Sequence, residues 1–158
     1  EYEKRSVRSP IRELDRREVQ RIRKKKTDRH LLFNLERFEK EYGIGDERTD
    51  YYLAEGWLID DRRDNALFDR SLILIHGDEG IEALMLPKYR EDVTLVHKKA
   101  KRAALAGFVC KIPSSFIDES RHYETYFVLK DKGRKNGRIA VWDSGILQGD
   151  VREGGFEE

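Results

Sequence analysis

Tyr51-Tyr52-Leu53-Ala54-Glu55-Gly56-Trp57-Leu58-Ile59 is the stretch that decides the fold. Large apolar, aromatic and β-branched residues surround one glycine there, and this is the composition of a buried strand. Because Gly56 has no side chain, a neighbouring strand or the Trp57 ring can approach the backbone closely. The chain before this stretch is charged and has helical spacing, whereas the chain after it consists of strands and turns.

The chain after this stretch contains several more short strands, separated by turn residues. We expect them at residues 71–76, 81–86, 107–112, 122–130, 138–143 and 146–147. Only residues 91–106 have the pattern of a helical crossover, so parallel α/β architecture is excluded. The pattern predicts a mainly β fold, an antiparallel β-sandwich of about seven short strands preceded by one long or two short α-helices.

The part of the chain before the Trp57 stretch, residues 1–50, is called the lead-in here. It has apolar residues at spacings of three and four, which predict an apolar stripe along a helix over residues 9–42. Ser9 and Pro10 suit the start of a helix, and Gly43 suits its end. The stripe thins near Lys26, so either one long helix or two helices with a joint there fit the pattern. We expect the second half to cover the sandwich and the first half, which has fewer apolar residues, to project away.

The predicted domain organisation follows from this division and from charge. Residues 1–50 form a basic helical lead-in and connector, residues 51–148 the β-sandwich, and residues 149–158 a frayed tail. The chain has 158 residues and a net charge of +1, but residues 1–30 alone sum to +6 and the rest to −5. This asymmetry indicates two parts with different surroundings.

Cys110 is the single cysteine, which excludes an internal disulfide and fits a reducing compartment. No apolar run is long enough to cross a bilayer, and the start does not read as a signal peptide. We therefore expect a cytoplasmic protein, with peripheral membrane contact left open. Because the chain opens on Glu1 without an initiator methionine, we expect either a piece of a longer protein or a processed product.

The sequence offers few carboxylate pairs that could hold a divalent metal for a sugar-transfer reaction. Asp60-Asp61 and Asp46-Glu47 are the nearest candidates, and both lie in charged connectors that read as solvated turns. The four histidines, His30, His76, His97 and His122, lie in separate elements without a second ligand at zinc spacing. No phosphate loop or nucleophile motif is present. We expect no metal, no cofactor and no catalytic residue.

Two tryptophans and one charged pair are the candidate binding residues of the β region. Trp57 and Trp142 read either as core anchors or as stacking platforms for a glycan. Arg90 and Asp92 read as an ion pair or a cap at the entry to the crossover, with ligand binding as the alternative.

The lead-in carries a cluster of basic side chains that can contact an anionic surface. They are Arg16, Arg17, Arg21, Arg23, Lys24, Lys25, Lys26 and Arg29. No aromatic residues interleave with these charges and the remainder of the chain is acidic, which argues against nucleic acid. A solvated face, contact with anionic membrane lipids and self-association through this helix stay open.

Five short motifs occur in the order found in a known family. They are Glu55-Gly56-Trp57, Arg90-Glu91-Asp92-Val93, Ala106-Gly107-Phe108, Tyr126-Phe127-Val128-Leu129 and Asp143-Ser144-Gly145. In this order and spacing, residues 51–148 resemble a small β-sandwich accessory module of bacterial glycosyltransferases and teichoic-acid-type glycerophosphotransferases. The resemblance does not reach the basic lead-in.

The resemblance implies a non-catalytic accessory or interaction domain, with glycan binding as one role. Its partner is then a catalytic domain of the same polypeptide, a glycosyltransferase of cell-wall or cell-surface polysaccharide biosynthesis. Two alternatives remain from the residues themselves. One is a module that binds nucleic acid or an anionic membrane through the basic helix, and the other is a small stand-alone enzyme.

Overall fold

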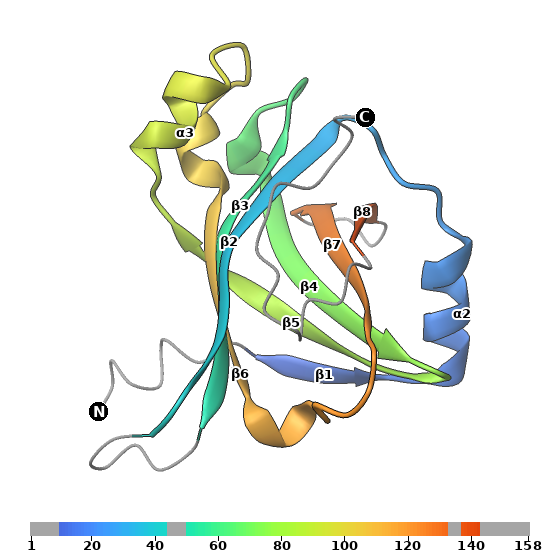
Figure 1. Cartoon of the computed structure of the whole chain (residues 1–158). Coiled ribbons are helices and arrows are strands. Elements are labelled where there is room, and N and C mark those ends of the chain that lie inside the picture. Colours follow the sequence, from blue (N-terminus) through green and yellow to red (C-terminus); the bar gives the residue numbers. More distant parts are fainter. Residues whose placement is uncertain (1–9, 44–49, 133–136, 143–158) are drawn as a thin grey trace.

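The computed structural model describes residues 10–43, 50–132 and 137–142, and in the last of these segments it places only the side chain of Ile139. Within these residues the chain is mainly β (Figure 1). The strands are β1 (Ile11–Leu14), β2 (Leu31–Glu41), β3 (Tyr51–Asp60), β4 (Phe68–His76), β5 (Glu79–Lys88), β6 (Gly107–Pro113), β7 (Glu124–Asp131) and β8 (Gly137–Trp142). The helical elements are α2 (Arg16–Lys24), η1 (Asn65–Leu67), α3 (Glu91–Val96), η2 (Ala103–Ala106) and η3 (Ser114–Phe116).

The described strands pair antiparallel throughout, as the sequence predicts, and the isolated bridge from Thr27 to Ile139 is parallel. The strands form one hydrogen-bonded path in the order β2-β3-β6-β5-β4-β7-β8, and β1 pairs with β5 beside this path. The sheet curls so far that Thr27, just before β2, bridges to Ile139 on β8, and Asp28 N donates to Ile139 O at 2.9 Å. Among the described strands the pairing therefore gives one curled sheet rather than the two separate sheets of the predicted sandwich.

The predicted helix over residues 31–42 is wrong, because Leu31–Glu41 is the strand β2. It pairs with β3 along its whole length, with a register shift between Leu35 and Arg37. Four of its apolar residues, Leu31, Phe33, Leu35 and Phe38, lie inside the curled sheet, where Phe33 and Phe127 have ring centroids 4.4 Å apart. The lead-in therefore contributes a strand to the sheet rather than a covering helix.

The expected helix start at Ser9 and Pro10 is also wrong. Pro10 precedes the strand β1, and the helix α2 begins only after Asp15. Asp15 and Glu18 form a capping box, in which Asp15 Oδ1 accepts from Glu18 N at 2.8 Å and Glu18 Oε1 accepts from Asp15 N at 3.1 Å. This reciprocal pair satisfies two otherwise free N–H groups at the first turn.

Helix α2 packs on the sheet instead of projecting away from it (Figure 1). Its buried residues Val19 and Ile22 lie in a cluster on the outer face of the sheet. The other members of that cluster are Leu14, Ile73, Ile75, Tyr126, Val128 and Ile139. Two apolar side chains are enough here because the receiving sheet face is itself apolar. No described helix is long and apolar enough to span a membrane.

Candidate functional site

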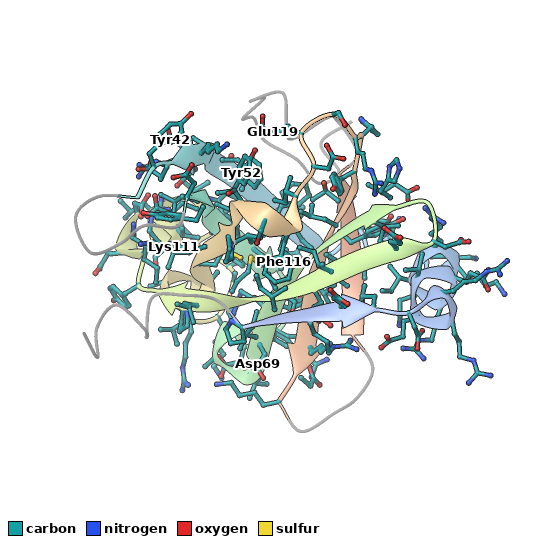
Figure 2. The ribbon with its side chains drawn as sticks, turned by 90° about the horizontal axis from the view of Figure 1, so that it is seen from below. Tyr42, Tyr52, Asp69, Lys111, Phe116 and Glu119 are labelled. Carbon is teal, nitrogen blue, oxygen red and sulfur yellow. The ribbon has the colours of Figure 1, made fainter. Side chains whose placement is uncertain are left out.

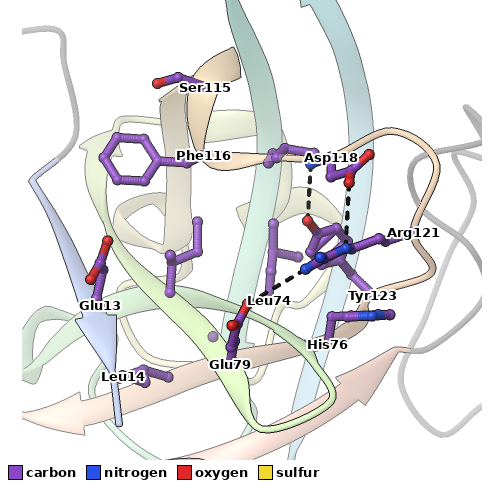
Figure 3. Close-up of a pocket in the computed structure, with 13 residues that line it drawn as sticks. Glu13, Leu14, Leu74, His76, Glu79, Ser115, Phe116, Asp118, Arg121 and Tyr123 are labelled. Carbon is purple, nitrogen blue, oxygen red and sulfur yellow. Dashed lines mark hydrogen bonds and ion pairs between the residues drawn. The ribbon is translucent and has the colours of Figure 1, made fainter.

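A cleft of about 500 Å3 lies at the end of β4, between β1, the β4–β5 turn and η3 (Figure 3). We name it the turn cleft. The polar and aromatic side chains that line it are those of Glu13, His76, Glu79, Phe116, Asp118, Arg121 and Tyr123. These residues come from three separate stretches of the chain, so the curl of the sheet is what assembles them.

Phe116 supplies the exposed aromatic surface of the cleft. It ends the short helix η3, and 38% of its surface is exposed although it is large and apolar. The next residue, Ile117, is buried in the core and fixes the turn that carries Phe116. In Figure 3 the Phe116 ring lies on one side of the cleft, across from Arg121 and His76.

The loop after η3 is anchored at both ends and in its middle. Tyr123 is buried at one end, and its hydroxyl accepts a hydrogen bond from Asp118 N at 2.9 Å. In the middle, the Tyr52 hydroxyl donates to Glu119, which also pairs with Lys40 at 3.3 Å (Figure 2). The pKa of Tyr52 is raised, mainly because the hydroxyl is buried and secondly because it donates to the Glu119 carboxylate. The hydroxyl therefore keeps its proton. The loop is thereby held in place for the side chains that line the cleft.

Arg121 joins the two acidic sides of the cleft. Its Nη1 lies 3.5 Å from Glu79 Oε1, and its Nε lies 3.4 Å from Asp118 Oδ2. All three side chains are substantially exposed, so these contacts are weak and readily exchanged for a ligand. Ser120 donates to Asp118 through its hydroxyl at 2.7 Å and its backbone at 3.0 Å, and these bonds lower the pKa of Asp118. Asp118 is therefore an acceptor at neutral pH.

His76 is fixed beside Tyr123. Its Nδ1 lies 3.2 Å from the carbonyl of His122, and because a carbonyl can only accept, Nδ1 carries the hydrogen. Its ring centroid is 6.0 Å from that of Tyr123. When the imidazole is neutral, Nε2 is therefore an acceptor.

The arrangement combines an exposed ring with a guanidinium and carboxylates on the facing side. Such a combination suits a ligand with an apolar face and several hydroxyl groups. Within the described residues, no group of His, Cys, Asp and Glu side chains could hold a metal ion.

Trp57 lies on the outer face of β3, away from the turn cleft. Its indole is partly buried and packs against the cluster that contains Val93 and Ala103. Its ring meets His97 edge to face, with centroids 4.7 Å apart. Trp142 is the last residue of β8, opposite Thr125, and its side chain lies outside the described part of the structure.

Arg90 and Asp92 form an ion pair, with Nη2 and Oδ2 2.7 Å apart. Arg90 also makes two hydrogen bonds to Glu36, at 2.6 and 2.9 Å. The hydrogen bonds that Arg90 donates to Asp92 and Glu36 raise the pKa of Arg90. The aliphatic part of Arg90 lies so close to Gly107 that a Cβ there would overlap it. The pair thus ties the crossover to β2 and β6, and it does not line the turn cleft.

The basic residues of the lead-in fall into three groups in the structure: residues paired with carboxylates, exposed residues on α2, and residues beyond the end of α2. Arg23 pairs with Glu124 through two hydrogen bonds, at 2.9 and 3.0 Å, and Arg16 lies 3.5 Å from Asp78. Arg17, Arg21 and Lys24 are exposed on the side of α2 opposite Val19 and Ile22. Lys25, Lys26 and Arg29 lie beyond the helix end, in the connection to β2.

The lining of the turn cleft was not predicted from the sequence, which identified residues 113–121 only as a connection. One usable signal is Asp118 followed two residues later by Ser120, a local turn pattern that orders a loop. Comparison with known proteins gives no match to any protein-family model, curated protein or solved structure. The function is therefore argued from the geometry and from the sequence resemblance.

Proposed function

We propose that this chain is a non-catalytic accessory domain that binds carbohydrate for a bacterial enzyme of cell-surface polysaccharide synthesis. The observation that supports this most directly is the exposed Phe116 ring facing Arg121 across the turn cleft. The ordered motifs that resemble glycosyltransferase accessory modules supply the class of ligand and of parent enzyme. The antiparallel sheet has the same class of fold, mainly β, as those accessory modules.

A sugar fits this cleft for chemical reasons. The C–H face of a pyranose is apolar and packs on an aromatic ring, while its hydroxyl groups both donate and accept. Glu79 and Asp118 accept, and Arg121 donates in a planar fork. Because the ion pairs among these residues are exposed and weak, replacing them with sugar hydroxyls costs little.

This proposal places the glycan at Phe116 rather than at the tryptophans identified from the sequence. The indole of Trp57 packs under the crossover segment that carries α3 and η2. Phe116 therefore replaces Trp57 as the stacking residue.

The test is a titration of the 15N-labelled chain with neutral oligosaccharides and with a glycerol-phosphate oligomer, followed by amide chemical shifts. Shifts are expected at residues 76–81 and 115–123. Phe116→Ala should weaken binding about five- to tenfold, the value of one aromatic contact. Tyr89→Ala, which removes an exposed ring at the other end of β4, is the matched control. Absence of shifts at the cleft with every probe would contradict the proposal.

The rival of a small stand-alone enzyme is tested separately. The isolated chain is incubated with nucleotide-sugar donors or CDP-glycerol together with an acceptor oligosaccharide. No product is expected, because the cleft offers no buried acid–base pair. Turnover that Arg121→Met abolishes would show that the domain is catalytic.

A second role, contact with an anionic membrane, is favoured by the charge on helix α2. Arg17, Arg21 and Lys24 recur at spacings of four and three, so they lie on one stripe. Within the described residues, these three side chains have no ion pair. Vesicles that contain anionic lipid should bind the chain in a salt-sensitive manner, and reversing these three charges should abolish the binding. Equal binding to neutral vesicles would exclude this role.

A further inference from the structure

A second cavity, of about 430 Å3, lies at the opposite end of β4 from the turn cleft. We name it the arginine cavity. Its apolar lining includes Phe68, Met85 and Phe108, which also belong to the core inside the curled sheet. Its rim carries Lys88, Tyr89, Leu105 and Lys132. The cavity is thus a recess that leads from the surface to the core.

Arg70 is the charged group of this cavity. Side chains alternate along β4, and Phe68 and Leu72, two residues to either side, belong to the inner core. Arg70 therefore points to the same inner side, and only 6% of it is exposed. Burial lowers the pKa of Arg70 to about 10, which still leaves the guanidinium charged at neutral pH.

The guanidinium is held by neutral acceptors. Nε donates to Leu58 O at 2.8 Å, and Nη2 lies 3.3 Å from Asn65 Oδ1 and 3.5 Å from Asn65 O. Within the described part of the chain, Arg70 makes no ion pair and its Nη1 makes no hydrogen bond. Asp69, the adjacent residue, is exposed at the edge of the cavity and forms no ion pair with Arg70, although its negative charge favours the charged guanidinium.

A buried charge without a direct ion-pair partner is costly, and the cost is relieved when an anion pairs with it. A carboxylate or phosphate at Nη1 would be that anion, and a guanidinium binds both in a planar, charge-assisted geometry. Lys132 on the rim adds positive charge at the opening, while Lys88 is already paired with Glu55. The apolar residues deeper in the cavity offer no hydrogen bonds, so the rest of the ligand must be apolar.

We propose that the arginine cavity binds a small organic anion, whose carboxylate or phosphate pairs with Arg70 and whose apolar body rests on Phe68, Met85 and Phe108. The volume suits one aryl or short alkyl group, since ligand sites begin at roughly 300 Å3. This site is independent of the turn cleft, because none of its lining residues is shared.

The experiment uses benzoate and phenyl phosphate as probes, with benzyl alcohol as the neutral analogue of the same shape. Binding is followed by chemical shifts of the 15N-labelled chain. We expect both anions to shift the Arg70 Nε–H signal and the amides of Leu105 and Gly107. Benzyl alcohol should bind at least about tenfold more weakly, because it lacks the charge-assisted pair. Inorganic phosphate should also bind more weakly than phenyl phosphate, because it lacks the apolar body.

Arg70→Met should remove the preference for the anions, whereas the matched variant Arg62→Met, at an exposed arginine that lines neither cavity, should bind them like the unaltered chain. Leu105→Trp fills the mouth of the cavity without touching Arg70, and it should weaken all the probes even if Arg70→Met does not fold. The proposal is overturned if benzoate and benzyl alcohol bind equally, if Arg70→Met retains the preference, if the shifts map to the turn cleft, or if no probe binds. Failure of oligosaccharide binding at the turn cleft leaves this inference unaffected.

Discussion

Gly56 on β3 lies directly against the carbonyl oxygen of Asn34 on β2, so close that a Cβ at position 56 would overlap that atom. The neighbouring strand approaches as the sequence predicts. Asn34 O is backbone in a paired strand and cannot turn away, so a methyl group at Gly56 must push the strands apart.

Gly56→Ala should therefore destabilise the chain by about 1–3 kcal/mol, the usual cost of overpacking. Urea unfolding followed by tryptophan fluorescence measures the loss. Gly77→Asn is the control, because Gly77 has open space around its Cα and a φ of 60° that Asn tolerates. That variant should stay within about 0.5 kcal/mol of the unaltered chain. Equal stability of the two variants would show that the strands adjust freely.

The strands after residue 50 could be predicted because their signals are local. Residues 71–76 and 81–86, for example, are apolar runs separated by Gly77 to Gly80, and they form the hairpin of β4 and β5. The curl of the sheet has no such local signal. It depends on Thr27 meeting Ile139, residues that are far apart in the sequence.

The error at β2 has a physical cause in its register shift. The inward residues are Leu31, Phe33, Leu35 and Phe38, so their spacing is two, two and then three. A β-bulge adds the extra residue. When Phe33 is overlooked, the spacing of Leu31, Leu35 and Phe38 is four and three, which is also the spacing of a helix.

The residues of the turn cleft could not be predicted from spacing. Glu13, Glu79 and Arg121 are brought together only when β1 pairs with β5 and the η3 loop folds over the β4–β5 turn. Ile117 and Tyr123, which anchor the loop, read in the sequence as ordinary apolar residues. Arg70 could not be predicted either, because it is buried only through the position of β4 in the curled sheet.

Trp57 should matter less for stability than a fully buried ring. Phe108 is 0% exposed and contacts the core, so Phe108→Ala should cost about 3–5 kcal/mol. Because Trp57 is only partly buried against Val93 and His97, Trp57→Ala should cost about half as much. Urea midpoints compare the two variants, and the oligosaccharide titration should be unchanged in Trp57→Ala. Lost sugar binding with intact stability would restore Trp57 as a glycan platform.

Glu82 should make stability depend on pH in the acid range. Burial alone would raise the pKa of Glu82, but the hydrogen bond from Arg12 at 2.8 Å and the charge of Lys130 at 3.2 Å outweigh it and lower the pKa. The native pKa is thus below the unfolded one. The contribution of Glu82 is complete above the unfolded pKa and is lost as pH falls through the native pKa.

Glu82→Gln should cost about 1–3 kcal/mol at neutral pH, because it removes two charge-assisted contacts that hold β1 and β7 to β5. The difference from the unaltered chain should shrink as the pH is lowered below the unfolded pKa of Glu82. Urea midpoints over a pH series measure this, with Glu91→Gln on the exposed first turn of α3 as the control. A constant difference at all pH values would assign the effect of Glu82 to packing rather than to charge.

Helix α2 should stabilise the sheet mainly through its two buried side chains. Val19 and Ile22 cover Ile73 and Ile75 on the outer face, and burial of each is worth about 1.5–3 kcal/mol. Val19→Ser with Ile22→Ser should therefore cost about 3–6 kcal/mol and expose an apolar patch that promotes association. Urea unfolding and gel filtration measure the two effects.

Arg17→Ser with Arg21→Ser, on the opposite side of the helix, should leave both stability and elution volume nearly unchanged while weakening the binding of anionic vesicles. If the two double variants are equally stable, α2 does not hold the sheet.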